Sequence, residues 1–180
     1  MLTAKVPKTI DDLLKLPPET RAELLEGEIF MSPSPTSKHQ AFVRNLSSQL
    51  IAFVTARKLG TVFFAPLDVV LSRHEVVQPD ILFVSAKRSP IIGDRIEGAP
   101  DLVVEVVSAG TEVRDRVVKR SLYARRGVRE YWIAELEKRT VEVLKLRGSK
   151  YTLHVLFEPG DSITSPVLAG LSIPLDPLFE

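Results

Sequence analysis

The stretch of residues 99–128, APDLVVEVVSAGTEVRDRVVKRSLYARRGV, decides the fold. Its first half is an apolar run of strand length that holds one acid, Glu105, and its second half has apolar residues at helical spacing among basic ones. Another apolar run, residues 129–136, follows at once. A strand, a helix and a second strand in this order usually pair their two strands in parallel, which is typical of an α/β protein.

The remaining apolar runs, rich in Val, Ile and Phe, extend the predicted sheet. They are residues 61–71, 76–85, 139–146 and 150–157. The last two flank Arg147, Gly148 and Ser149, so they are predicted to form a hairpin. The sequence therefore predicts an α/β fold whose mixed central sheet, over residues 61–157, is flanked by helices.

Helices are predicted where apolar residues at helical spacing follow a capping residue and end at a glycine. The predicted helices span residues 9–16, 19–26, 37–58 and 112–126. Their predicted caps are Thr9, Ser37 with Gln40, and Thr111, and their predicted stops are Gly27, Gly60 and Gly127. We expect one domain over residues 1–180, with helices in its N-terminal part, 9–58, and extended coil or short turns in its tail, 158–180.

The composition is that of an ordinary globular protein, with 44% hydrophobic and 26% charged residues. No apolar run approaches the roughly 20 residues that a membrane-spanning helix needs, and the first residues lack the apolar segment of a secretory signal. The absence of cysteine excludes disulfides, thiol catalysis and thiolate metal sites. We therefore expect a cytoplasmic protein with no membrane partner. The net charge of +1 does not select a partner.

Two acids lie inside apolar strand segments, Glu105 and Asp80 in VVQPDILFVS. A buried carboxylate needs a partner, which can be an arginine or lysine, its own proton or a metal ion. Asp80 alone is also explained as a strand-end residue that caps a turn or pairs with an arginine. If the two strands are neighbours, the two carboxylates converge, and Mg²⁺ or Mn²⁺ would neutralise them and reach for a substrate phosphate.

The helix after Glu105 carries the basic residues of the chain's most positive segment, since residues 114–129 contain seven Lys or Arg. Lys119 shares a face with Glu112, Asp115 and Tyr123 and is the candidate for a fixed ammonium beside a phosphate. The basic cluster, with Arg116 and Arg120, could bind phosphates of a nucleic acid. The alternative for each of these residues is an exposed helix with solvated charges.

The order of these motifs resembles a known family. ELLEGEIF, SPSP before His39, VVQPDILFV, APDLVVEVVS and GVREYWI together resemble the Uma-type family of restriction-endonuclease-like proteins, which is assigned to the PD-(D/E)xK nuclease superfamily. The resemblance covers residues 9–179. It implies a restriction-endonuclease-like fold and a Mg²⁺- or Mn²⁺-dependent endonuclease that hydrolyses phosphodiester bonds of double-stranded DNA. It also implies a homodimer, because cutting a duplex needs two sites.

The resemblance implies a role for individual residues. Asp80 and Glu105 match the two metal-binding acids, but Val107 stands where the superfamily usually has its lysine. Lys119 on the following helix matches the position to which this family is thought to move that lysine. Glu26 in ELLEGE resembles an accessory acid on an N-terminal helix that faces the site.

Two further residues are implied as contacts of the substrate. Gln78 is expected to line the pocket, and His39 to touch substrate or carry a proton, unless it is a structural histidine at a helix start. Two other functions stay open. The chain could be an inactive module that keeps the nuclease fold and binds nucleic acid, or a dimer in which Glu105 simply pairs with an arginine.

Overall fold

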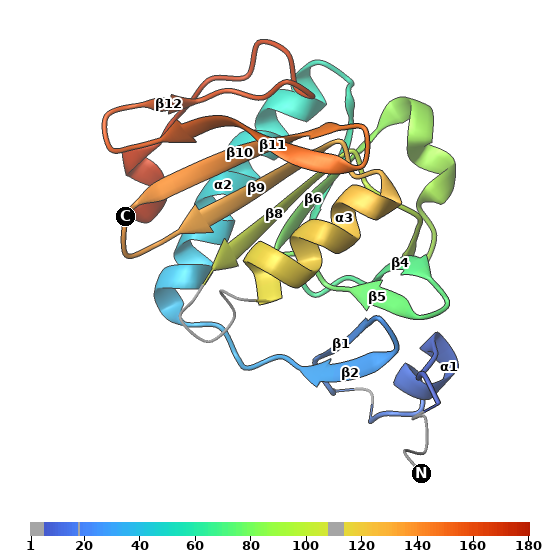
Figure 1. The fold of residues 1–180 in the computed structure, drawn as a ribbon. Helices are drawn as coiled ribbons and strands as arrows, with labels where there is room; N and C mark the ends of the chain where they lie inside the picture. The colour runs from blue at the N-terminus through green and yellow to red at the C-terminus, as the bar shows by residue number, and fades with distance from the viewer. Residues whose placement is uncertain (1–5, 18, 108–113) are drawn as a thin grey trace.

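The main layer of the fold is a six-stranded sheet in the order β11-β10-β9-β8-β6-β3 (Figure 1). The computed structural model describes residues 6–17, 19–107 and 114–180. In chain order the strands are β3 (Gly60–Phe64), β6 (Ile81–Ser85), β8 (Leu102–Val107), β9 (Glu130–Glu135), β10 (Thr140–Arg147) and β11 (Lys150–Phe157). Strands β8 and β9 are parallel and all other neighbours antiparallel. The predicted mixed sheet, its parallel pair and its hairpin are confirmed.

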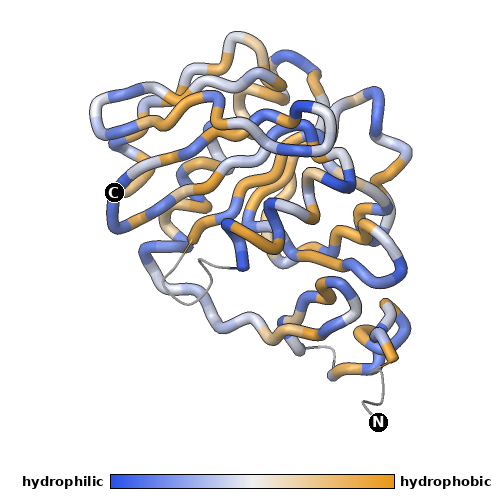
Figure 2. Tube along the Cα trace, viewed as in Figure 1, coloured by the Kyte–Doolittle hydropathy of each residue, from blue (hydrophilic) through white to orange (hydrophobic). Residues whose placement is uncertain are grey.

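Helices cover both faces of this sheet (Figure 1). Helix α2 (Ser37–Ala56) and the C-terminal 3₁₀-helix η3 (Asp176–Phe179) lie on one face, and α3 (Arg120–Arg126) lies on the other. The even-numbered residues of β8 pack in the core with α2, whereas its odd-numbered residues face α3. Figure 2 shows hydrophobic residues along the central strands and a mixture of hydrophobic and hydrophilic residues along the helices. Glu105 therefore points toward the α3 side.

A second sheet has the order β2-β1-β5-β4-β7 and holds the N-terminal part of the chain. Its strands are β1 (Ala22–Leu25), β2 (Glu28–Met31), β4 (Val69–Ser72), β5 (Glu75–Val77) and β7 (Ile96–Glu97). The helix predicted over residues 19–26 is therefore wrong. Glu26 and Gly27 form a two-residue hairpin turn with φ values of 51° and 80°. Pairing with β2 and β5 outweighs the local helix preference of Ala, Glu and Leu.

Two predicted strands are each divided between the two sheets. The run 61–71 breaks after β3 at Pro66, and the run 76–85 breaks between β5 and β6 at Pro79. Proline has no backbone donor, so it ends the pairing of a strand at each position. The chain thus passes from one sheet to the other beside Asp80, which ends up at the boundary between the sheets.

The other three predicted helices are present, although the first is shorter than predicted and one cap differs. The short helix α1 (Ile10–Leu13) has Thr9 as its N-cap, as predicted. Helix α2 buries the predicted apolar stripe, but its cap is Thr36, whose Oγ1 accepts a hydrogen bond of 3.3 Å from the backbone N–H of His39. The predicted cap Thr111 lies outside the described residues. Gly127 ends α3 in a left-handed conformation with φ 83°, as predicted.

The remaining segments are short. A 3₁₀-helix, η1 (Ala86–Ile91), follows β6, and a π-helical turn, η2 (Arg114–Lys119), leads into α3. The tail forms a two-stranded ribbon, β12 (Ser162–Ile163) with β13 (Ile173–Pro174), and packs through η3 against α2. Within the described residues, no helix is both long and apolar enough to cross a membrane.

Candidate active site

The predicted acids meet in a cavity of about 150 Å³. Its walls come from both sheets, the loop between β2 and α2, the start of α2, and η2. The charged and polar lining residues include Arg21, Glu23, His39, Gln78, Asp80, Glu105, Arg114, Asp115 and Lys119. The cavity therefore brings together side chains that lie up to about a hundred residues apart in the sequence, as the span from Arg21 to Lys119 shows.

Asp80 lies next to β8 because of the register of the sheet. Ile81 of β6 is opposite Val104, so the antiparallel register places Asp80 opposite Glu105. One carboxylate oxygen of Asp80, Oδ2, accepts a hydrogen bond of 2.7 Å from the backbone N–H of Val106. The other, Oδ1, lies 3.2 Å from Nε2 of His39. These contacts hold the Asp80 carboxylate at the cavity wall.

Lys119 points into the cavity and is buried. Its Nζ lies 2.8 Å from Oε1 of Glu23 and 3.0 Å from Oε1 of Glu105. Asp115, four residues earlier on η2, has its Oδ1 3.5 Å from the same nitrogen. Tyr123 of α3 also donates a hydrogen bond of 2.6 Å to Oε1 of Glu105. A single ammonium thus lies among three buried carboxylates.

Acids outnumber cations at this point of the cavity. Burial raises the pKa of Glu105 well above its ordinary value of 4.5, and the carboxylates of Asp115, Asp80 and Glu23 raise it further, although Lys119 opposes this. Burial alone would lower the pKa of Lys119, but the surrounding carboxylates raise it above its ordinary value of 10.5. The ammonium therefore stays charged. Because the carboxylates around it outnumber it, a further cation can bind beside them.

The donor chemistry suits a hard divalent cation. Within the described residues, no three acid or histidine side chains form a ready-made metal cage, and the Lys119 ammonium lies between the carboxylates of Glu23 and Glu105. Mg²⁺ is usually bound through only one or two carboxylates, together with waters and substrate phosphates. Two facing carboxylates, Asp80 and Glu105, with an excess of negative charge meet that requirement.

One predicted acid is replaced by another. Glu26 does not line the cavity, because it lies on the turn between β1 and β2, with its side chain 59% exposed and 2.7 Å from Arg125. The prediction that Glu26 faces the site on a helix is therefore wrong. Glu23 of β1 is the buried acid that contacts Lys119, and its Oε1 also accepts a hydrogen bond of 2.9 Å from the backbone N–H of Gln78.

The two arginines predicted to bind phosphates do not line the cavity. Arg116 pairs with Glu135 at 2.8 Å and with Glu142 at 2.5 Å, outside the cavity. Arg120 donates to the carbonyl of Tyr151 at 3.4 Å. Both residues face the strands β9 to β11 and do not line the cavity, so their binding to phosphates stays a prediction.

Arg21 and Arg114 line the cavity instead. The signal for Arg21 was present in the sequence: Arg21, Glu23 and Leu25 alternate with Ala22 and Leu24, which puts the first three on one face of a strand. A helix over residues 19–26 does not have this period of two, so it does not predict Arg21.

The register sets Asp80, just before β6, opposite Glu105 of β8, and a buried lysine contacts Glu105, which fits a nuclease-like protein of the restriction-endonuclease class. The sequence matches the Uma2 family, described as "Putative restriction endonuclease", over residues 10–176, and the chain belongs to this family. A search of curated proteins found no match.

A solved structure has the same fold. It is the crystal structure of a "putative nuclease belonging to DUF820" from Anabaena variabilis, with a TM-score of 0.79 and 26% sequence identity. The similarity covers 96% of this chain and 98% of that chain. The family and this neighbour support a nuclease-like function.

Proposed function

We propose that the protein is a metal-dependent endonuclease that hydrolyses phosphodiester bonds of double-stranded DNA. The observation that carries this proposal is the arrangement of Asp80, Glu105 and Lys119, which come from three segments and lie around one cavity with an excess of acids. The nuclease-like family and structural neighbour support the reaction class.

Asp80 and Glu105 are the proposed ligands of Mg²⁺ or Mn²⁺. Such an ion, when bound, lowers the pKa of a water molecule and stabilises negative charge on a phosphate. The protein's part is to hold the two carboxylates still. The backbone N–H of Val106 and the ring of His39 fix Asp80, while Lys119 and Tyr123 fix Glu105 through one of its oxygens.

Lys119 is proposed to stabilise the phosphate during hydrolysis. When water attacks phosphorus and the P–O bond to the leaving oxygen breaks, negative charge grows on the phosphate oxygens, and a fixed ammonium lowers the energy of that state. Glu23 and Asp115 keep the ammonium charged and oriented. Val107, at the position usual for the superfamily's lysine, packs in the core with α3 and cannot take this role.

His39 and Gln78 are proposed to contact the substrate or its water. Nδ1 of His39 and Oε1 of Gln78 are buried at the cavity and have no hydrogen-bond partner within the described part of the chain. Buried polar atoms without partners are rare and costly, so a bound molecule is expected to satisfy them. We further propose a homodimer, because one chain provides one site and a duplex has two strands to cut.

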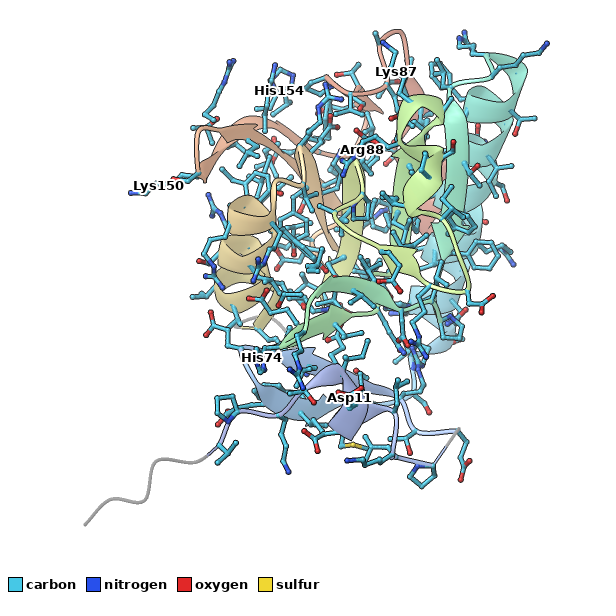
Figure 3. All side chains as sticks on the ribbon, turned by 90° about the vertical axis from the view of Figure 1, so that its right-hand side faces the viewer. Asp11, His74, Lys87, Arg88, Lys150 and His154 are labelled. Atoms are coloured by element: carbon cyan, nitrogen blue, oxygen red, sulfur yellow. The ribbon has the colours of Figure 1, made fainter. Side chains whose placement is uncertain are left out.

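The test is cleavage of supercoiled plasmid DNA in Mg²⁺ or Mn²⁺ by the wild type, Asp80→Asn and Glu105→Gln. We expect both variants to lose activity by at least about a hundredfold, because a metal ion contributes several kcal/mol of transition-state stabilisation. The matched control is Asp11→Asn. Asp11 is an exposed acid of α1 (Figure 3), is paired only loosely with Arg73 at 3.6 Å, and does not line the cavity.

The same assay separates the alternatives. Equal cutting by all four proteins would contradict the assignment of Asp80 and Glu105. DNA binding without cleavage in any divalent metal would favour an inactive nuclease-fold module. A linear product formed directly by a protein that elutes as a dimer would support the homodimer, whereas only nicked circles from a monomer would oppose it.

A further inference from the structure

Two arginines of the cavity differ from comparable arginines in having no acid partner among the described residues. Several arginines are likewise only partly exposed, and they pair with acids: Arg88 with Asp101, Arg95 with Asp68, and Arg116 with Glu135 and Glu142. Arg21 and Arg114 are also partly buried, but neither forms an ion pair within the residues that the structure describes. This is notable because four acids line the same cavity.

The guanidinium groups of these two arginines also keep buried donors available for a ligand. The Nε atom of Arg21 and that of Arg114 are buried, with no hydrogen-bond partner in residues 6–17, 19–107 and 114–180. A guanidinium group only donates hydrogen bonds and never loses its charge near neutral pH. A buried donor without an acceptor is unfavourable, so these groups are suited to a ligand that accepts hydrogen bonds and carries negative charge.

The two arginines come from different segments that line the cavity. Arg21 directly precedes β1, where its carbonyl accepts a hydrogen bond of 2.8 Å from the backbone N–H of Ser32. Arg114 begins η2, and its guanidinium carbon lies 6.0 Å from the centre of the Phe30 ring. The backbone contact fixes the main chain at Arg21, and the ring contact limits the motion of the Arg114 side chain.

The size of the cavity limits what can enter. A volume of about 150 Å³ is enough for one phosphate group with several waters. Phe30 and Met31, on the edge strand β2, are partly or largely exposed, so they are available to the rest of a nucleotide.

We propose that Arg21 and Arg114 form a clamp for a backbone phosphate of the nucleic acid beside Asp80 and Glu105. The clamp rests on the proposed function only in the identity of its ligand, because binding of the phosphate does not require cleavage. Planar guanidinium groups can each give two parallel hydrogen bonds to phosphate oxygens. The clamp reads the backbone and not the bases, so it contributes affinity without sequence preference.

The test is the binding of a short labelled DNA duplex in EDTA, where cleavage is absent, measured by fluorescence anisotropy over a range of KCl concentrations. The proteins are the wild type, Arg21→Gln, Arg114→Gln and the control Arg73→Gln, whose exposed arginine lies outside the cavity. Arg21→Lys is added in case Arg21→Gln does not fold, because it keeps the charge while losing the planar fork.

We expect each Gln variant to bind about tenfold more weakly, which corresponds to the loss of one charged hydrogen bond. The slope of log K against log salt should fall in magnitude by about 0.9 for each phosphate that the variant no longer neutralises, and Arg73→Gln should keep the wild-type slope. Arg21→Lys should keep the slope but bind more weakly. Unchanged affinity and slope in both folded Gln variants would overturn the clamp.

Failure of the clamp differs from failure of the proposed function. A wild type that binds DNA through both arginines but never cuts it would retain the clamp and exclude the endonuclease. A wild type that cuts DNA while the Gln variants bind as tightly as it does would retain the endonuclease and exclude the clamp. A wild type with no salt-dependent binding to the duplex would overturn the clamp.

Discussion

Two buried acids lie four residues apart at strand β8, and their surroundings are opposite. Asp101, just before the strand, is fully buried, accepts a hydrogen bond of 2.8 Å from the backbone N–H of Ser85, and lies 3.3 Å from Arg129 and 3.7 Å from Arg88. One carboxylate there has two guanidinium groups and an amide. Glu105, four residues later, shares one ammonium with two other carboxylates.

The difference teaches how a buried acid is to be interpreted. Burial alone does not indicate function, because Asp101 is more deeply buried than Glu105 and its partners explain it completely. The two acids differ in the balance of charge around them. The two arginines beside Asp101 balance its charge and stabilise the fold. The carboxylates around Glu105 outnumber the ammonium of Lys119, so this group is suited to bind a further cation.

The largest expected effect on stability comes from removing Lys119, whose ammonium contacts the carboxylates of Glu23, Glu105 and Asp115. Lys119→Met should lower the free energy of unfolding by about 3–5 kcal/mol, because it leaves buried carboxylates without their partner. Adding Glu23→Gln should restore part of this loss. Chemical denaturation followed by circular dichroism measures both. A Lys119→Met protein as stable as the wild type would show that the carboxylates are not held charged.

A smaller loss of stability is expected at Asp101, whose charge is balanced by two arginines. Asp101→Ala should destabilise the fold by roughly 1–3 kcal/mol, because the backbone N–H of Ser85 is left without an acceptor. Its two arginines are partly exposed and can be solvated. DNA cleavage per folded molecule should stay at the wild-type level. A loss of cleavage without a loss of stability would contradict the assignment of a structural role to Asp101 and a functional role to Glu105.

The stability of the protein should depend on pH because burial and the neighbouring carboxylates raise the pKa of Glu105. The pKa of Glu105 is raised in the folded protein, so above pH 4.5 the folded state holds a proton that the unfolded state has released. Stability from this group is therefore complete below pH 4.5 and is lost as the pH rises through the folded pKa, with a slope of at most about 1.4 kcal/mol per pH unit.

The raised pKa of Lys119 acts in a different range, because its contribution is lost only above 10.5. Denaturation between pH 5 and 8, without metal, should show the slope in the wild type and not in Glu105→Gln. Saturating Mg²⁺ should reduce it, since the ion replaces the proton. The same slope in both proteins would exclude Glu105 as its source.

The smallest effect is expected on the hairpin turn. Glu26→Gln removes an exposed ion pair with Arg125, so it should change stability by at most about 0.5 kcal/mol and leave cleavage unchanged. Glu23→Gln, three residues away but buried beside Lys119, should impair cleavage by comparison. An equal loss in both variants would indicate that the turn approaches the substrate.

Much of the central fold could be predicted because its signals are local. The apolar run through β8, the helically spaced residues after it and the run through β9 are each recognisable within about ten residues, and chirality and loop length then favour a parallel pair. Asp80 and Glu105 stood out for the same reason, since each is a charged residue in an apolar strand segment.

The second sheet could not be predicted in this way. Residues 22–25 are good helix formers, and they become strand β1 because β2, across a two-residue turn, and β5, distant in the sequence, pair with its two edges. A helix over residues 19–26 predicts Glu26 as the accessory acid, whereas strand β1 places Glu23 in the cavity. The helix does not predict Arg21 either, since its direction follows from strand alternation.

The sequence by itself determined the parallel core, the two strand acids and the absence of a lysine at Val107, because periodicity and residue type are written locally along the chain. Tertiary structure decided which charges meet. Register places Asp80 opposite Glu105, the π-helical turn directs Lys119 inward, and the second sheet adds Glu23 and Arg21. The physical reason is that charge balance in a cavity is a sum over distant segments.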